Sequence, residues 1–126
     1  MSGFSFDSNI VIDALAGYEL ARSEILRALG RDSRVWVSRM VWVEVLSKGS
    51  DEGLRRARTM LSGFSVDEID EEIALRAAAL RRERPRLKSP DAIILATAQT
   101  RGRVLITRNT KDFPAEMPGI RVPYIL

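Results

Sequence analysis

The chain has 126 residues, of which 45% are hydrophobic, and this predicts a single domain spanning residues 1–126 with a sizeable core. It contains no histidine and no cysteine, which excludes imidazole and thiolate metal sites, disulfides and histidine-based acid–base catalysis. The formal net charge of +3 modestly favours a polyanionic partner. No apolar run approaches the ~20 residues of a membrane span and no secretory signal is recognised. We therefore expect a cytoplasmic protein with no membrane partner.

The first part of the chain predicts two strands, each followed by helical sequence. The predicted elements are a strand at 4–6, a short helix at 10–15, a helix at 18–29, a loop at 30–33, a strand at 35–37 and a helix at 39–47. Asp7 directly follows the first strand. Glu44 is the lone acid in an otherwise apolar helix.

The second part continues the same alternation. It predicts a helix at 51–61, a strand at 64–66, a helix at 71–84, a helix beginning near 89, a strand at 104–106 and an edge strand within 118–126. Pro123 argues against a central place for the last strand, because proline cannot donate to a ladder. The alternation predicts a three-layer α/β/α fold with a mostly parallel central sheet.

The stretch from Ser89 to Phe113 combines a helix, a buried strand and a polar loop. Ser89 is expected to cap the helix, Pro90 suits its first position, and Asp91 suits the positive end of its dipole. Gly102 should end the helix, and the apolar strand at 104–106 is followed by polar residues 107–112. Functional groups of open α/β sheets collect just past the carboxyl ends of strands, so Asp91 and this loop are candidates for one site.

Asp7, Glu44 and Asp91 stand apart from the other acids because each lies in or beside apolar sequence. An unpaired buried carboxylate is costly, and these segments offer no obvious basic partner. If the fold brings the three together, a divalent cation would relieve their repulsion. Oxygen ligands alone favour Mg²⁺, with Mn²⁺ as the alternative, and such ions serve phosphodiester hydrolysis.

Other interpretations of the same residues stay open. Asp7 could simply cap a helix, although Asn9 could do so instead, and Asp91 could be an ordinary first-turn acid. Asp112 could be a ligand or a loop cap. The remaining acids, Asp13, Glu24 and Asp67 among them, are expected on solvated faces or at caps. The basic segment at 81–88 could grip RNA phosphates or be a solvated helix end.

Four segments in order, F-D-S-N, S-R-M-V-W-V-E-V-L, S-P-D-A-I-I-L-A-T-A and V-L-I-T-R-N-T-K-D-F, resemble the PIN-domain nucleases. The resemblance is strongest to the VapC ribonuclease toxins of type II toxin–antitoxin systems and spans nearly the whole chain. It implies an endoribonuclease that uses Mg²⁺ or Mn²⁺, forms a homodimer and is held inactive by a small cognate antitoxin.

Within that resemblance, Asp7 and Asp91 match the two principal metal-binding aspartates and Glu44 matches the glutamate. Many members carry a further acid directly after the T-R pair, where this chain has Asn109, and Asp112 is the remaining candidate for that role. Ser8 and Asn9 match a polar pair after the first acid, and Thr107 matches a hydroxyl near the metal. These would orient carboxylates and water. Arg108 or Arg39 could steady the phosphate.

Two rival functions remain. A phosphatase of the haloacid dehalogenase type also begins with a strand and an aspartate, but it needs a second aspartate at position 9, where this chain has Asn9. The second rival is a catalytically weakened module that binds nucleic acid or an antitoxin. Asn109 favours it, whereas Asp7, Glu44 and Asp91 argue against it.

Overall fold

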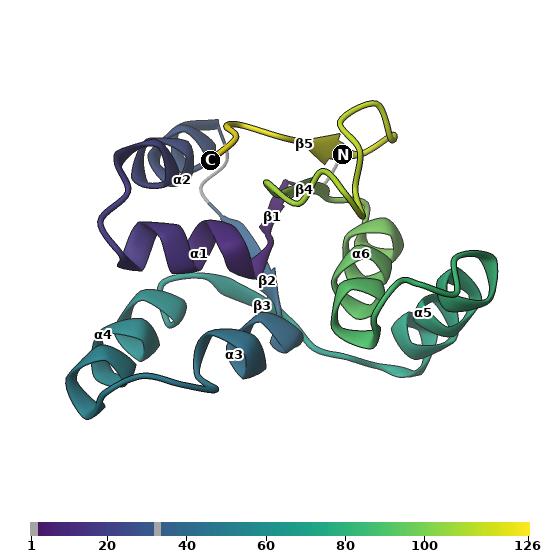
Figure 1. Cartoon of the computed structure of the whole chain (residues 1–126), viewed down its shortest axis with the longest axis horizontal. Coiled ribbons are helices and arrows are strands. Elements are labelled where there is room, and N and C mark those ends of the chain that lie inside the picture. The colour runs from purple at the N-terminus through teal and green to yellow at the C-terminus, as the bar shows by residue number, and fades with distance from the viewer. Residues whose placement is uncertain (1–2, 32–33) are drawn as a thin grey trace.

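The computed structural model describes residues 3–31 and 34–126 and contains a five-stranded parallel sheet with strand order β3-β2-β1-β4-β5 (Figure 1). The strands are β1 (Phe4–Phe6), β2 (Val35–Ser38), β3 (Ser65–Asp67), β4 (Val104–Ile106) and β5 (Ile120–Arg121). β1 lies at the centre, with Phe4 paired to Val35 on one side and to Val104 on the other. All carboxyl ends of the strands therefore point to one edge.

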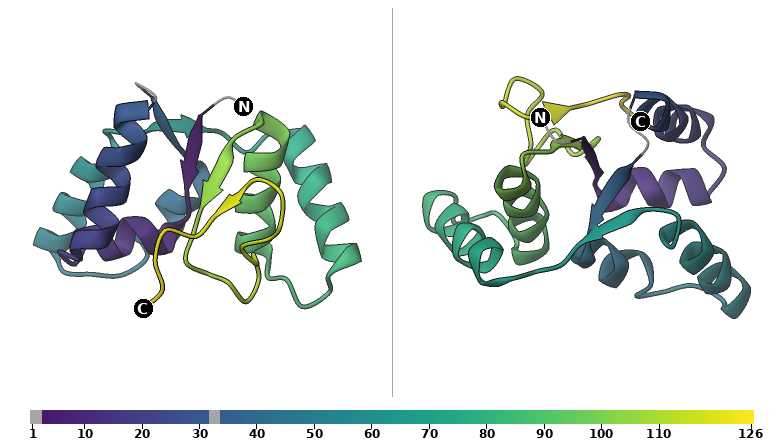
Figure 2. Two further views of the ribbon diagram at one scale, coloured as in Figure 1. Left: turned by 90° about the horizontal axis from the view of Figure 1, so that it is seen from above. Right: turned by 180° about the vertical axis from the view of Figure 1, so that it is seen from behind.

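Helices cover both faces of this sheet, as the alternation of elements predicts. They are α1 (Ser8–Leu15), α2 (Glu19–Arg31), α3 (Arg39–Val45), α4 (Asp51–Leu61), α5 (Glu71–Glu83) and α6 (Ser89–Arg101). α5 and α6 pack together on one side, and α1, α2 and α4 lie on the other (Figures 1 and 2). α3 contacts both α1 and α6. The predicted three-layer α/β/α class is confirmed.

The core lies where the central strands meet α1 and α6. Phe6, Ile106 and Ile10 are completely buried. α6 is buried on more than one side, with a run of buried residues from Ile94 to Ala98, which explains its weakly amphipathic sequence. Gly102 ends α6 in the left-handed conformation at φ 69°, as its place in the sequence predicts.

Three local predictions were wrong. The cap of α6 is Lys88 rather than Ser89, because the carbonyl of Lys88 already accepts the first helical bond, from the amide of Ala92, and no side chain caps this end. α2 runs through Gly30 to Arg31, so half of the predicted loop at 30–33 is helical and the other half lies outside the described residues. Asn9 does not cap α1, because Asp7 does.

The C-terminal segment forms a shorter strand than expected. β5 contains two residues and stops before Pro123, which has no amide hydrogen to continue the ladder. It lies at the edge of the sheet beside β4, as predicted. Tyr124 then turns inward, packs against Tyr18 with ring centroids 5.2 Å apart, and anchors the tail. Across the described residues, no helix is both long and apolar enough to cross a membrane.

Candidate active site

A cleft of about 280 Å³ opens at the carboxyl edge of the sheet. It is lined by Asp7, Ser8, Asn9, Ile12, Glu44, Asp91 and Asn109. Asp7 follows β1, Glu44 comes from the helix after β2, Asp91 from the first turn of α6, and Asn109 from the loop after β4. Four distant segments thus supply one polar surface, and the three acids singled out in the sequence face the same cleft.

Asp7 is the most buried of these acids, with 3% of its surface exposed. Its Oδ1 accepts from the amide of Ser8 at 2.7 Å, which caps α1. Its Oδ2 accepts from Thr107 Oγ1 at 2.7 Å and from Asn9 Nδ2 at 3.3 Å. Asp7 is therefore both a helix cap and a site carboxylate, so the two interpretations of this residue do not exclude each other.

Burial raises the pKa of the Asp7 carboxyl to about 6, and the charges of Asp91 and Glu44 act in the same direction. The hydrogen bonds from Thr107 and Ser8 oppose this rise without cancelling it. Burial also raises the pKa of Asp91, and the charges of Asp112 and Glu44 raise it further, while Lys88 lowers it. The acids are thus close enough to repel one another.

Glu44 is half-buried rather than enclosed in the core, and its Oε1 accepts from Ser8 Oγ at 2.5 Å. Ser8 therefore links the glutamate of α3 to the start of α1, where Asp7 sits. The hydroxyl fixes the direction in which the carboxylate points. Ser8, which the sequence assigned an orienting role by resemblance alone, lies where such a role requires it.

The loop after β4 is held by its own polar side chains. Thr107 is fully buried, and its Oγ1 accepts from the Asn109 amide at 3.0 Å. Asn109 Nδ2 donates to Asp112 Oδ2 at 3.0 Å, and its Oδ1 accepts from the Asp112 amide at 3.2 Å. Asn109 lines the cleft, whereas Asp112 does not, although its charge raises the pKa of Asp91.

The chemistry of this donor set fits a hard divalent cation. The polar lining consists of carboxylate, amide and hydroxyl oxygens with an amide nitrogen, and burial and repulsion raise the pKa of two of its acids. Among residues 3–31 and 34–126, no three acidic side chains are already arranged to ligate one ion. The oxygens of Asp7 are occupied by Ser8, Thr107 and Asn9, so side chains would have to turn toward a bound ion.

Three acids expected on solvated surfaces are in fact buried. Asp67 pairs with Arg103 at 2.8 Å, and Glu24 pairs with Arg27 and Arg121. Each carboxylate is buried beside a long guanidinium that reaches it from elsewhere in the fold or from the next turn of the helix. Surface placement was the wrong expectation because a paired carboxylate tolerates burial.

Asp13 is the third buried acid, and its partners come from the loop after β4 and from the C-terminal segment. Its Oδ2 accepts from Arg108 Nε at 2.6 Å and from the Tyr124 hydroxyl at 2.8 Å. Arg108 also donates its amide to Asn9 Oδ1 at 3.3 Å. The suggested phosphate-steadying role of Arg108 is thereby weakened, because its guanidinium is engaged. Asp13, like Glu44, is an acid that interrupts an apolar run in the sequence, and this was the signal that could have predicted its burial.

The other cation suggested for phosphate, Arg39, forms a bidentate pair with Glu68 at 2.5 and 2.9 Å. Its guanidinium also lies over the Trp42 ring, 4.8 Å from the centroid. Both contacts hold this side chain on the surface beside α3. Neither arginine named from the sequence therefore lies ready for a phosphate in the cleft.

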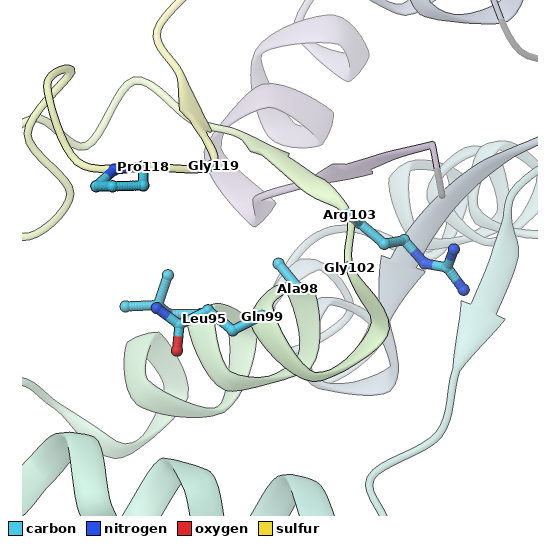
Figure 3. A pocket seen from close by; sticks show the side chains of 7 residues that line it. All are labelled: Leu95, Ala98, Gln99, Gly102, Arg103, Pro118 and Gly119. Carbon is cyan, nitrogen blue, oxygen red and sulfur yellow. The ribbon is translucent and has the colours of Figure 1, made fainter. Parts of the chain in front are cut away.

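A second hollow lies at the opposite, amino edge of the sheet (Figure 3). It is lined mainly by apolar side chains and glycines: Leu95, Ala98, Gly102, Pro118 and Gly119, with Gln99 and Arg103. The Arg103 side chain points away from the hollow, toward Asp67 (Figure 3). Gln99 accepts from Arg76. This hollow has no converging set of polar groups and is not a catalytic candidate.

The sequence model of the PIN domain matches residues 5–115. Among solved structures, a chain of a toxin–antitoxin complex from Klebsiella pneumoniae is 42% identical, with a TM-score of 0.84, covering 98% of this chain and 100% of that one. A chain of the DNA-bound VapBC complex from Salmonella typhimurium is 25% identical, with a TM-score of 0.79 and 96% of each chain covered. A chain of DNA-bound VapBC2 from Rickettsia felis shares the fold, with 19% identity and a TM-score of 0.77 over 93% of this chain and 94% of that one. No match was found among curated proteins.

The chain belongs to the PIN-domain family. Its resemblance to the VapC type, indicated by four motifs in the sequence, is confirmed by the toxin–antitoxin complex and the VapBC complex from Klebsiella pneumoniae and Salmonella typhimurium among its structural neighbours. PIN domains of this toxin type are nucleases, and the cleft at the carboxyl edge of the sheet is the candidate active site of such an enzyme.

Proposed function

We propose that this protein is a Mg²⁺-dependent endoribonuclease and the toxin of a type II toxin–antitoxin system. The observation that carries this proposal is the convergence of Asp7, Glu44 and Asp91 in one cleft, with raised pKa values at both aspartates. Asp7, Glu44 and Asp91 would hold Mg²⁺ or Mn²⁺, and Asn109 or Asp112 would assist. When bound, the ion supplies a Lewis acid that activates water and stabilises the charge on phosphate oxygens.

The chain's own contribution is to orient the ligands. Thr107 Oγ1 donates to Asp7, and Ser8 Oγ donates to Glu44, so a hydroxyl group orients each of these two carboxylates at the cleft. Asn9 joins the two sides of the site, because its Nδ2 contacts Asp7 and Thr107 Oγ1 at 3.3 and 3.4 Å. These bonds would keep the acids pointing inward before RNA arrives.

The proposed partners are an RNA substrate, a small cognate antitoxin and a second copy of this chain in a homodimer. Support for the antitoxin comes from the Klebsiella pneumoniae structure, a toxin–antitoxin complex whose chain is 42% identical to this one over nearly its full length. Cellular RNA as substrate would place the activity in the cytoplasm.

The test is cleavage of a labelled RNA by the purified protein with Mg²⁺, with EDTA, and with Asp7→Asn or Asp91→Asn. The proposal expects cleavage by the wild type with Mg²⁺ and a loss of about 10²-fold or more with EDTA or with either variant. Glu116→Gln, an exposed acid outside the cleft, is the matched control and should retain full activity. Cleavage that survives EDTA and both variants would contradict the metal mechanism.

A second candidate is a PIN module with weakened catalysis that acts by binding nucleic acid or an antitoxin. Asn109 favours it, because the family's common acid after the T-R pair is replaced by a neutral amide that is bonded to Asp112. The variant Asn109→Asp separates the two proposals. A large gain in cleavage from a nearly inactive wild type would support the binding module, and an already active wild type would reject it.

A further inference from the structure

A groove with a volume of about 420 Å³, distinct from the carboxylate cleft and from the hollow at the amino edge, lies between the α5–α6 connection and the loop after β4. It is lined by Arg84, Pro85, Arg86, Leu87, Lys111 and Asp112. Arg86 and Lys111 are exposed, whereas Leu87 is almost fully buried. The groove therefore presents cationic side chains on a firmly packed base.

This groove adjoins the carboxylate cleft. Asp112 lines the groove and accepts a hydrogen bond from Asn109, which lines the cleft. Lys88, two residues beyond Arg86, is close enough to Asp91 for its charge to lower the pKa of that acid. A strand of nucleic acid with one phosphate at the carboxylates would therefore meet this groove at a neighbouring phosphate.

The groove has three cationic side chains and one acid, Asp112, in its lining, so its net charge is positive. Elsewhere, arginines are engaged with acids: Arg27, Arg39, Arg55, Arg76, Arg101, Arg103, Arg108 and Arg121. In the part of the chain that the structure describes, Arg84, Arg86 and Lys111 form no ion pair. A polyanion is the partner that such a surface attracts.

Arg84 adds a more specific observation. Its Nη2 donates to the backbone carbonyl of Asp112, which ties the two walls of the groove together. Its Nη1 is buried and has no hydrogen-bond partner among the described residues. A buried guanidinium nitrogen without an acceptor is costly, and a phosphate in the groove would supply the acceptor once the Arg84 side chain turns toward it.

The opposite side of the cleft has a different character. There the cleft continues into a hollow that is lined mainly by apolar side chains and glycines, with Lys48 as the one cationic residue in its lining. Ile12 and Glu44 line both spaces. Apolar walls offer little to a phosphate backbone. The basic groove is therefore the better exit for an RNA strand, and its continuity with the carboxylates favours RNA over an acidic polypeptide.

We propose that Arg84, Arg86 and Lys111 bind the RNA backbone at phosphates adjacent to the one that is cleaved. This inference rests on the proposed ribonuclease function and adds the path of the substrate. Arg86 and Lys111 contact phosphates directly, and Arg84 both contacts RNA and fixes the position of the loop at 107–112.

The test compares Arg86→Ala/Lys111→Ala with Arg55→Ala/Arg58→Ala, which removes two exposed positive charges from α4 on the other side of the sheet. Binding of a fluorescein-labelled single-stranded oligouridine is measured by anisotropy in EDTA over a salt series, and a denaturing gel verifies that the RNA is intact. Each phosphate contact to a single strand contributes a salt slope of about 0.7, so each lost contact weakens binding about fivefold at about 0.1 M salt.

The groove variant should bind about 25-fold more weakly than wild type at about 0.1 M salt, with a salt slope smaller by about 1.4, while the control stays within about twofold. In cleavage assays its KM should rise with little change in kcat. Equal binding by the two variants would overturn the proposal. So would tighter binding of polyglutamate than of RNA, with the same loss in the groove variant, because the groove would then serve an acidic protein.

These readouts separate the groove from the nuclease proposal. Weakened binding in the groove variant together with absent cleavage in every condition supports the groove and contradicts the nuclease function. Metal-dependent cleavage with unchanged RNA binding in the groove variant supports the nuclease function and contradicts the groove proposal. Thermal melts of both variants verify that the changes at these exposed positions leave the fold intact.

Discussion

The carboxylate cleft should make the metal-free protein less stable than it would be with a neutral residue at position 7. The pKa of Asp7 is raised from 3.8 to about 6 by burial and, to a lesser extent, by the charges of Asp91 and Glu44. Because one pKa unit corresponds to about 1.4 kcal/mol, the ionised Asp7 destabilises the folded state by about 3 kcal/mol at pH 7. Asp7→Asn removes this charge.

The amide can keep the main contacts of the carboxylate. Its Oδ1 can still accept from the Ser8 amide, and its Nδ2 can donate to Thr107 Oγ1. The variant should therefore be more stable than wild type in EDTA at pH 7, by up to about 3 kcal/mol in urea unfolding. The control Glu116→Gln, at an exposed position, should change stability by less than about 0.5 kcal/mol.

The pH dependence has a definite sign. The folded state binds the Asp7 proton more tightly than the unfolded state does. The stability that this proton contributes is fully present below about pH 4 and is lost as the pH rises through about 6. The difference in free energy of unfolding between Asp7→Asn and wild type should thus be large at pH 7 and should vanish as the pH falls to about 4. An Asp7→Asn protein that is equally or less stable than wild type in EDTA at pH 7 would refute this reasoning.

Three further predictions concern the buried acids Asp13, Asp67 and Glu24. Asp13→Asn should lower the free energy of unfolding by about 2 kcal/mol, because it weakens bonds from Arg108 and Tyr124, and Tyr124→Phe should lower it by about 1 kcal/mol; urea unfolding measures both. Asp67→Ala should lower the free energy of unfolding by about 3 kcal/mol or more, because it breaks a buried ion pair with Arg103. Arg55→Ala breaks an exposed ion pair and should lower it by less than about 1 kcal/mol. Equal effects of the two variants in thermal unfolding would contradict this prediction. Burial tends to raise the pKa of Glu24, but hydrogen bonds from Arg121 and Arg27 outweigh burial, so the pKa is lowered. Glu24→Gln should therefore be less stable than wild type at pH 7, and this difference should vanish as the pH falls below about 4. A difference in stability that persists in acid would be inconsistent with this prediction.

Most of the architecture follows from local patterns in the sequence. Short apolar runs that end in an acid or hydroxyl predict β1, β2 and β4, and helical spacing predicts the helices between them. Asp7, Glu44 and Asp91 could be singled out from the sequence because they sit in or beside apolar sequence, where an unpaired carboxylate is costly. Parallel strands then bring these positions to one edge.

The partners of the buried acids were not predictable. Asp13 and Arg108 are 95 residues apart, and Glu24 and Arg121 are 97 apart, so nothing local indicates that they meet. The bounds of the short β5 were not predictable either, because two residues carry no period and only pairing to β4 defines the strand. Local sequence patterns predict secondary structure and burial, whereas ion pairs between distant residues depend on how the helices and the sheet pack together.

Diffraction from crystals soaked in Mn²⁺ tests the central claim most directly, because the anomalous signal locates the ion without relying on activity. We expect an anomalous peak inside the cleft, within ligand distance of the carboxylate oxygens of Asp7, Glu44 and Asp91, and no such peak in crystals of Asp91→Asn. A wild-type cleft that stays free of Mn²⁺ at millimolar concentrations, or a peak bound elsewhere on the protein, would contradict it.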